Sequence, residues 1–496
     1  MRYRILACDY DGTLARRGRV GDETTRALRA LTRTGRKLVL VTGRELDDLR
    51  NVFPSIEVFD WVVAENGGFI HQPATGEERA LGPPPPQALV SELTSRGVHP
   101  LSVGRVIIAT WEPHQTVVFE TIQRLGLELQ VIFNKGAVMV LPPNVNKRSG
   151  LEAALDRLGL SVHNCIGVGD AENDHAFLGV CECSVAVANA LPALRESVDW
   201  VTDYDHGAGV RQVIDALIAD DLQGFERRLT RHHVPVGTTA AGEPAAIAPY
   251  GSIVLVAGSS GSGKSTATAG ILEQLAERGY QLCIVDPEGD HERAPGVVVL
   301  GTHEQPPQLE QVVQVLSAPQ AHVVVNLLAV SLSDKPDFLL ALLARLFELR
   351  ATTSRPHWIV IDEAHHMLQD GFMPALLTLP QELGGLMLVT VNPERLNRVL
   401  LGRVDVVIAV GRDGEATLAT FARVLERAPP TIDAAPERPG QALLQHARAR
   451  RAELVNLTPS RVVNRRHKRK YAQGELGPDK SFYFRGPDGR LNLRAQ

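Results

Sequence analysis

Two aspartates near the start of the chain, Asp9 and Asp11, have the spacing required for chemistry on a phosphate ester. They end an apolar run that begins at Ile5 and is typical of a buried strand. Residues two apart in a strand face the same side, so we expect both carboxylates above one pocket. One carboxylate can attack phosphorus as a nucleophile while the other protonates the leaving oxygen. The pair therefore predicts a phosphoryl-transfer site at the end of the first strand.

Polar groups at later strand ends extend the same predicted site. The hydroxyl group of Thr42, in the segment VTGR, is placed to hold a phosphoryl oxygen. Lys147 opens a helix and can neutralise charge that develops on the phosphoryl group. Asp170 and Asp174, in GVGDAEND, supply the oxygen ligands that Mg²⁺ prefers. Any one of these carboxylates could instead cap a helix or face solvent, but their order at successive strand ends favours a magnesium-dependent site.

A second phosphate-binding motif lies in the C-terminal half. The segment VAGSSGSGKST has the pattern Gly258-x₄-Gly263-Lys264-Ser265, and it stands between an apolar strand and a helical stretch. Its glycines let backbone N–H groups turn towards phosphates, while the lysine reaches the terminal phosphates and the serine binds Mg²⁺. A flexible glycine-rich loop is the alternative. The flanking strand and helix favour a P-loop that binds ATP.

An acidic pair follows a later apolar strand, in HWIVIDEAHH. We expect Asp362 to hold Mg²⁺ through water and Glu363 to polarise the water that attacks ATP. A kinase has no need of the second carboxylate, so the pair indicates ATP hydrolysis. The letters DEAH also suggest a helicase of the DEAH-box type, but the partner motifs of those helicases and the ABC signature are absent from the sequence.

The elements that must position these residues alternate between short apolar strands and amphipathic helices, which is the α/β pattern. Strands of the first block end in polar or glycine residues, where open α/β sheets place their ligands. The alternation is interrupted once, as if by an inserted subdomain, and lapses again in a Pro/Gly/Ala-rich stretch. The predicted organisation is a first domain (1–220) with an inserted cap (about 71–146), a linker (221–250), a P-loop domain (251–445) and a basic tail (446–496).

The segments DYDGT, VTGR, NVNKRSGLEAAL and GDAEND resemble, in order, the motifs of the haloacid dehalogenase (HAD) superfamily, in particular its Cof-type subfamily IIB. The resemblance implies a Rossmann-like domain whose inserted α/β cap selects small phosphorylated metabolites, such as sugar phosphates. It also implies that Asp9 becomes an aspartyl-phosphate, that Asp11 is the acid/base, and that Thr42 and Lys147 bind the phosphoryl group. The implied Mg²⁺ ligands are Asp9, Asp170, Asp174 and the Asp11 carbonyl, with Asn173 in support.

The segments CIVDPEGDHE, IDEAHHML and VTVNPERL together resemble the HerA/FtsK-type ATPases, over about residues 250–445. The resemblance implies a RecA-like P-loop domain that typically forms rings and often moves DNA, so we expect a homo-oligomer. Three arginines become candidates for an arginine finger acting across a subunit boundary: Arg395, Arg398 and Arg403. The expected nucleotide-binding residues are Gly258, Gly261, Gly263, Lys264, Ser265, Thr266, Asp362 and, at a sensor position where the family more often has glutamine, Asn392.

Composition limits the remaining classes. No apolar run approaches the ~18 residues of a membrane helix, and the N-terminus does not have the pattern of a signal peptide. The five cysteines are scattered, so we expect a cytoplasmic protein without disulfides or membrane contact. Residues 446–496 hold 13 Lys and Arg against 4 Asp and Glu, interleaved with aromatic residues. This tail suits nucleic acid, and a solvated tail is the alternative.

The two motif sets belong to unrelated folds, so the sequence predicts a fusion of two enzymes. The expected function is an Mg²⁺-dependent phosphatase for a small phosphorylated metabolite, joined to an ATPase that regulates or assembles it. The alternative is an ATP-driven nucleic-acid motor whose HAD domain processes phosphate ends or nucleotides. A third hypothesis, a scaffold that binds ATP without turnover, is opposed by Glu363, which a pure binding module does not need.

Overall fold

A mainly parallel sheet of eight strands forms the centre of the N-terminal half. The computed structural model describes residues 1–291, 296–369, 384–447, 449–461, 482–485 and 491–495. The strands are β1 (Ile5–Asp9), β2 (Lys37–Val41), β3 (Trp61–Ala64), β4 (Phe69–Gln72), β5 (Glu77–Ala80), β10 (Cys165–Gly169), β11 (Cys183–Ala186) and β12 (Trp200–Val201). Their order is β12-β11-β10-β1-β2-β3-β4-β5, and the strands from β12 to β3 are parallel. Central parallel strands are buried on both faces, which explains their continuous apolar sequences.

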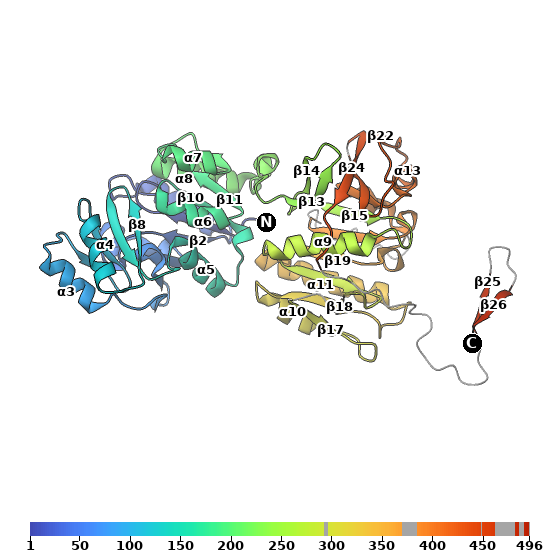
Figure 1. Ribbon diagram of the computed structural model, residues 1–496, viewed down its shortest axis with the longest axis horizontal. Helices are drawn as coiled ribbons and strands as arrows, with labels where there is room; N and C mark the ends of the chain where they lie inside the picture. The colour runs from blue at the N-terminus through green and yellow to red at the C-terminus, as the bar shows by residue number, and fades with distance from the viewer. Residues whose placement is uncertain (292–295, 370–383, 448, 462–481, 486–490, 496) are drawn as a thin grey trace.

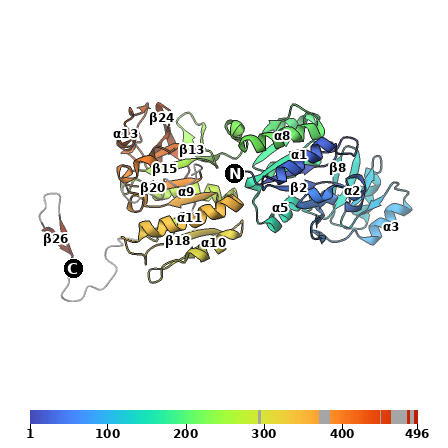
Figure 2. The same ribbon diagram turned by 180° about the vertical axis from the view of Figure 1, so that it is seen from behind.

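Helices cover both faces of this sheet. They are α1 (Asp22–Thr32), α2 (Leu46–Val52), α5 (Lys147–Leu158), α6 (His175–Val180), α7 (Pro192–Ser197) and α8 (His206–Asp220). Helices α1 and α8 pack together on one face, and α5 and α6 pack together on the other (Figure 1, and from behind in Figure 2). The carboxyl ends of β1, β2 and β10 are therefore left open at one edge of the sheet.

The inserted cap occupies less of the chain than the predicted interval of 71–146. Strands β4 and β5 pair antiparallel onto the edge of the main sheet instead of entering the cap. The cap's own sheet has the order β6-β7-β9-β8. Its elements are α3 (Gln87–Ser95), β6 (Ser102–Val103), β7 (Ile108–Trp111), α4 (Gln115–Arg124), β8 (Gln130–Asn134) and β9 (Ala137–Leu141). The polar letters of β5, EERA, carry no apolar run that would have marked it as a strand of the main sheet.

A second sheet forms the centre of the C-terminal half. Its parallel part has the order β21-β15-β20-β19-β16-β18-β17. These strands are β15 (Ile253–Ala257), β16 (Leu282–Asp286), β17 (Val297–Leu300), β18 (His322–Asn326), β19 (Trp358–Ile361), β20 (Leu386–Thr390) and β21 (Val406–Val410). The helices of this half are α9 (Lys264–Glu277), α10 (Leu309–Ser317), α11 (Lys335–Thr353), α12 (Arg398–Leu401) and α13 (Gly414–Val424). The apolar strands that the sequence predicts in both halves are thus present.

Parts of the expected linker and tail join the second sheet. Strands β13 (Val234–Thr239) and β14 (Pro244–Ile247) come from the interval expected as a linker, and β24 (Arg451–Leu457) comes from the expected tail. With β23 (Gln441–His446) they extend the sheet antiparallel beyond β21, and β22 (Thr431–Ile432) pairs with β24. Proline and glycine in β13 and proline in β14 concealed these two strands, because both residues are typical of turns.

A separate hairpin near the C-terminus consists of β25 (Phe482–Arg485) and β26 (Leu491–Ala495). The Lys/Arg cluster that prompted the nucleic-acid prediction, in residues 462–481, lies outside the described residues. Within the described part of the chain, no helix is long and apolar enough to cross a membrane.

Candidate active sites

Lys147 lies between two carboxylates at the open edge of the first sheet. Its Nζ is 2.5 Å from Asp9 Oδ1 and 2.6 Å from Asp174 Oδ1, and all three side chains are buried. Burial by itself would lower the pKa of Lys147, but Asp174 and Asp9 raise it above its ordinary value. A fully charged ammonium group therefore stands beside the carboxylate expected to be the nucleophile.

The first turn of α5 fixes the position of Lys147. Asn146 Oδ1 accepts hydrogen bonds from the N–H groups of Arg148 and Ser149, and Ser149 Oγ accepts one from the Asn146 N–H. This reciprocal pair is a capping box, which anchors the start of the helix. Gly67 packs against this turn so closely that a Cβ there would lie 1.9 Å from the Asn146 carbonyl oxygen. The loop after β3 thus holds the helix that carries Lys147.

Asp170 follows β10 and is bound from both the core and the cap. It accepts hydrogen bonds from Thr13 Oγ1 at 3.0 Å and from Lys135 Nζ at 2.5 Å. Lys135 lies in the turn between β8 and β9, so the cap reaches into the site. Gly12 permits this approach, because it has a φ of 92° and a Cβ there would lie 2.2 Å from Asp170 Oδ2. Sequence reasoning missed Lys135, since nothing in FNKGAV indicates a partner outside the cap.

Asp11 is bound through both carboxylate oxygens by an arginine. Arg44 Nε and Nη2 donate to the two carboxylate oxygens of Asp11, at 2.6 Å and 2.8 Å. The Asp11 side chain is 46% exposed, whereas Asp9 is buried. Thr42 directly follows β2, and its Oγ1 accepts a hydrogen bond from the Arg44 N–H at 3.1 Å. Sequence reasoning also missed Arg44, although its place in VTGR was the available signal.

The aspartates at this edge fit a divalent cation. Asp9, Asp170 and Asp174 each offer a carboxylate oxygen within 4.8 Å of the others, and all three are buried. Burial raises the pKa of Asp9 and of Asp170, so additional positive charge would stabilise their ionised forms. Asn173 Oδ1 is a buried acceptor with no hydrogen-bond partner among the described residues. Such oxygen donors suit Mg²⁺.

The second motif forms the loop between β15 and α9. Gly261 and Gly263 have φ angles of 83° and 103°, a backbone conformation that glycine adopts without steric cost. Lys264 is buried, and its Nζ lies 3.0 Å from the Ser259 carbonyl oxygen of the same loop. Backbone N–H groups at a helix start, together with a lysine, suit phosphate groups. The loop and the first turn of α9 contain Gly258, Gly261, Gly263, Lys264, Ser265 and Thr266.

The acidic pair follows β19, which is separated from the P-loop strand by β20 alone. Asp362 Oδ2 lies 3.0 Å from His291 Nε2, and Asp362 Oδ1 accepts the Glu363 N–H at 2.9 Å. Glu363 Oε2 is buried without a hydrogen bond among the described residues. Burial, together with Asp362, raises the pKa of Glu363 to about 7. A carboxyl group that titrates near neutrality is suited to exchange a proton with water.

The expected sensor residue lies at the end of the intervening strand. The Asn392 N–H donates to Thr390 Oγ1 at 3.0 Å, and that hydroxyl is 3.2 Å from His365 Nδ1. The three arginines considered as an arginine finger follow this segment and are exposed: Arg395, Arg398 and Arg403. Arg398 pairs with Glu426 of the same chain at 3.0 Å. The structure thus places all three at the surface of the C-terminal half.

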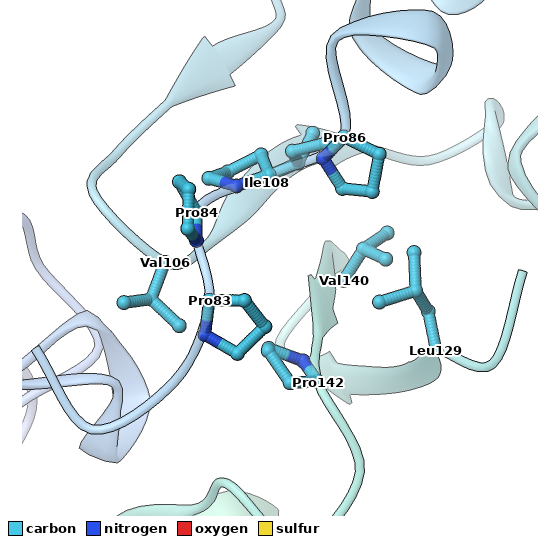
Figure 3. Close-up of a pocket in the computed structure, with 9 residues that line it drawn as sticks. Pro83, Pro84, Pro86, Val106, Ile108, Leu129, Val140 and Pro142 are labelled. Carbon is cyan, nitrogen blue, oxygen red and sulfur yellow. The ribbon is translucent and has the colours of Figure 1, made fainter.

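An apolar pocket of about 110 Å³ lies in the cap (Figure 3). It is lined by the proline run at 83–86 and by Val106, Ile108, Leu129, Val140 and Pro142. None of these side chains carries a charge or a hydrogen-bonding group, so the pocket is unsuited to a phosphate group. The charged groups that could bind a phosphate group lie instead at the strand ends of the first sheet, where Lys135 contacts Asp170.

Comparison with known proteins divides the chain in the same way. A family profile described as haloacid dehalogenase-like hydrolase matches residues 6–80 and 102–214, and one described as AAA domain matches residues 249–401. The phosphoglycolate phosphatase of Methanothermobacter thermautotrophicus is 33% identical over 221 residues, which cover 42% of this chain and 97% of that protein. The phosphoglycolate phosphatase of Halorubrum lacusprofundi is 30% identical over 222 residues, covering 43% of this chain and 96% of that protein.

Among solved structures, a haloacid dehalogenase-like hydrolase from Bacteroides thetaiotaomicron is similar to part of this chain. Its sequence identity is 18% and its TM-score is 0.39. The match covers 43% of this chain and 99% of that one. The interval between residues 80 and 102, which the first family profile leaves unmatched, contains α3 of the cap.

Proposed function

The chain belongs to the haloacid dehalogenase-like hydrolases and carries an AAA-type P-loop ATPase domain; from that premise we propose that its first site is a magnesium-dependent phosphatase for a small phosphorylated carboxylic acid. The expected fusion of two hydrolases is confirmed. The proposal is carried by two lysines that converge on the acidic cluster, Lys147 from the core and Lys135 from the cap. Phosphoglycolate, after which two relatives are named, has two anionic groups that such cations would bind.

In the proposed reaction, Asp9 attacks phosphorus and takes the phosphoryl group as an aspartyl-phosphate. Asp11 gives a proton to the leaving oxygen and later takes one from the water that hydrolyses this intermediate. Arg44 orients Asp11 through its two hydrogen bonds, and Lys147 neutralises charge on the phosphoryl oxygens. Mg²⁺ held by Asp9, Asp170 and Asp174 would supply further charge neutralisation.

Lys135 is the residue proposed to select the substrate. Its side chain is 45% exposed and comes from a turn of the cap, so it can leave Asp170 and bind a carboxylate on the substrate. A lysine in this place favours a substrate that has a second negative charge close to the phosphate. The sequence predicts a small phosphorylated metabolite, and the position of Lys135 favours a phosphorylated acid among these substrates. Sugar phosphates are the alternative substrate class.

For the second site, we propose ATP hydrolysis by the residues around the P-loop. Lys264 and the backbone of the loop would bind the phosphates, and Ser265 and Asp362 would hold Mg²⁺. Glu363 would take the proton of the attacking water, a role for which its raised pKa of about 7 is suited. Asn392, at the end of the strand between the two motifs, would contact the terminal phosphate or the water.

The phosphatase proposal is tested by phosphate release from 2-phosphoglycolate, sugar phosphates, nucleotides and 5′-phosphorylated DNA. The Lys264→Ala protein is used, because it removes the ATPase background. We expect the highest kcat/KM with 2-phosphoglycolate, and a loss of about tenfold or more in Lys135→Met, whereas Lys37→Met, at an exposed ion pair, is the control. A higher kcat/KM with sugar phosphates would contradict the proposal that the substrate is a phosphorylated carboxylic acid. Preferred release from DNA ends would instead favour the nucleic-acid motor.

A further inference from the structure

The helix that begins at Lys147 ends against the ATPase half. The last turn of α5 is closed by Gly159, whose carbonyl oxygen accepts a hydrogen bond from Arg355 Nη2 at 2.6 Å. Arg355 is fully buried and also donates to the carbonyl oxygens of Leu316 and Ser317. Burial lowers its pKa to about 10, so it remains charged at neutral pH. A cation here suits the unpaired carbonyls and the negative end of the helix dipole.

The helix that begins at Lys264 ends, conversely, against the phosphatase half. The cap of α9 is Arg278, whose carbonyl oxygen lies 2.6 Å from His163 Nε2. The His163 ring also stacks on Tyr280, with 3.9 Å between ring centroids. Each active-site helix is therefore capped at its C-terminus by a buried side chain from the other half of the chain.

The cap from the phosphatase half, His163, contacts a buried carboxylate of the same half, Glu182. Glu182 Oε2 lies 2.8 Å from His163 Nδ1 and accepts a hydrogen bond from the Tyr280 hydroxyl, also at 2.8 Å. Its other oxygen accepts a hydrogen bond from Arg2 Nη2 at 2.6 Å. Burial alone would raise the pKa of Glu182, but His163 and Arg2 hold it well below its usual range. One ionised carboxylate thus binds groups from both halves.

Short rigid elements lead from this junction to both active sites. His163 lies two positions before β10, whose five residues end one position before Asp170. In the ATPase half, α9 runs from the junction to the P-loop, and its 14 residues span about 21 Å. Figure 1 shows α5 and α9 on either side of the region where the two halves meet, and Figure 2 shows the same arrangement from behind.

We propose that this junction couples the two active sites, so that nucleotide in the P-loop changes the rate of the phosphatase. Phosphates bound at the start of α9 would shift this helix, and the carbonyl oxygen of Arg278 at its other end contacts His163. A displacement of α9 is passed to β10 and to Asp170 at its end. The coupling rests on the proposed function, because both sites must bind their ligands. Its free energy cannot exceed the difference in nucleotide affinity between the two positions of α9, before and after the displacement.

A metal site is the alternative interpretation of the side chains around Glu182. His163, Glu182 and His232 have possible ligand atoms within 4.8 Å of one another. The contacts oppose it: His163 Nδ1 is within hydrogen-bond distance of Glu182, and His232 Nε2 is 3.0 Å from the carbonyl oxygen of Cys181. The carboxylate also has Arg2 as a positively charged partner. A metal ion would have to displace these hydrogen bonds beside a guanidinium group.

The test measures hydrolysis of p-nitrophenyl phosphate by the full chain in excess Mg²⁺, with and without the ATP analogue AMP-PNP. We expect the analogue to change kcat/KM by at least about fivefold, the lower range of measured couplings. Lys264→Ala should abolish the effect, which shows that it arises at the P-loop and not from competition at the phosphatase site. His163→Gln should keep hydrolysis without nucleotide within about twofold of wild type and reduce the effect below about twofold. The matched control is His303→Gln, an exposed histidine of the ATPase half.

Tyr280→Phe is the second variant, because it keeps the stacked ring and loses only the hydrogen bond to Glu182; it should weaken the nucleotide effect and decides the outcome if His163→Gln fails to fold. A wild-type kcat/KM that AMP-PNP does not change would contradict the coupling. If the folded variants His163→Gln and Tyr280→Phe keep the full change in kcat/KM, the coupling does not pass through this junction. Absence of hydrolysis from the wild-type chain would instead contradict the proposed function. If the wild-type protein binds one equivalent of zinc and the His163→Gln protein binds none, the cluster is a metal site and not a hydrogen-bonded junction.

Discussion

Asp9 Oδ1 and Lys147 Nζ lie 2.5 Å apart in the buried centre of the first site, although 138 positions separate them in the sequence. Asp174 binds the same ammonium group from the other side. Removing one partner of a buried ion pair costs more than the pair contributes, because the remaining charge is left unpaired. Loss of Lys147 should therefore destabilise the domain as well as remove a group of the proposed chemistry.

Lys147→Met is predicted to lower the free energy of unfolding by about 3–5 kcal/mol in EDTA. The substitution keeps much of the side-chain volume but leaves Asp9 and Asp174 without their shared cation. Mg²⁺ should restore part of the loss, because it would neutralise the same carboxylates, while phosphatase activity stays abolished. Urea unfolding with and without Mg²⁺ measures this, with Lys37→Met as the exposed control. An equal loss under both conditions would count against a cation at this site.

Substitutions in the second site should separate ATP binding from turnover. Lys264→Ala removes the charge that neutralises the phosphates, so we expect ATP binding to weaken. Glu363→Gln keeps the size of the side chain but cannot take a proton from water, so ATP should bind and turnover should stop. Fluorescent-nucleotide binding and phosphate release measure the two effects. Hydrolysis at the wild-type rate by Glu363→Gln would mean that this carboxylate does not activate the water.

The junction between the two halves should weaken on acidification. His357 is buried there as the neutral ring, because its Nδ1 accepts the Gln281 N–H at 2.8 Å and its Nε2 faces Asn164 Oδ1 at 3.3 Å. Burial, followed by His163 and Arg355, lowers its pKa well below 6.5. The unfolded chain binds a proton at this residue near pH 6.5 and the folded chain does not, so stability falls as the pH drops below that value.

His357→Gln should reduce this dependence of stability on pH. Between pH 6 and pH 5 the slope of the unfolding free energy should decrease by up to about 1.4 kcal/mol per pH unit, since one proton fewer is taken up on unfolding. Other buried histidines supply the slope that remains. Urea unfolding at several pH values measures the change, and His303→Gln should leave the slope as it is. The same slope in both variants would show that His357 is already protonated in the folded chain.

We propose that the ATPase half works as an oligomer, whereas the phosphatase half needs no second subunit. The arginines that could complete the ATPase transition state are exposed: Arg395, Arg398 and Arg403. An arginine supplied in trans can contribute ~10³-fold or more to turnover. ATPase activity per subunit should rise with protein concentration, and one Arg→Ala variant should lose turnover while it still binds ATP. A dilution series with particle mass measured in parallel tests this; a monomer with full, concentration-independent activity would exclude it.

The strand ends of both halves could be predicted from the sequence because parallel strands bring their carboxyl ends to one edge of a sheet. This is why Asp9, Asp170 and Asp174 gather as expected from their order along the chain, and Lys147 joins them from the start of α5. Lys135 could not be found in this way. Its contact with Asp170 depends on how the cap packs over the core, and a single lysine in a turn carries no signal of that packing.

The junction was equally hidden from the sequence. The letters around His163 and Arg355 give no sign of a distant partner, and only the folded chain makes these two residues the caps of helix ends in the opposite half. Strand β13 was missed for a different reason: its letters VPVGTT contain turn-forming residues, and one of its two pairing partners, β24, is far along the chain. Local patterns therefore predicted which strand ends carry the candidate sites but not the contacts made between distant segments.

The role of Asp9 as nucleophile is tested most directly by phosphate release from the best substrate of the screen, measured in the Lys264→Ala background with and without Asp9→Asn. The carboxamide keeps the shape of the side chain but cannot attack phosphorus, so release should be abolished. Asp11→Asn should still form some aspartyl-phosphate from substrates with good leaving groups, because loss of a general acid costs only ~10²–10⁴-fold. Near-normal phosphate release by the Asp9→Asn protein would contradict the assignment of this site as a phosphatase that works through an aspartyl-phosphate.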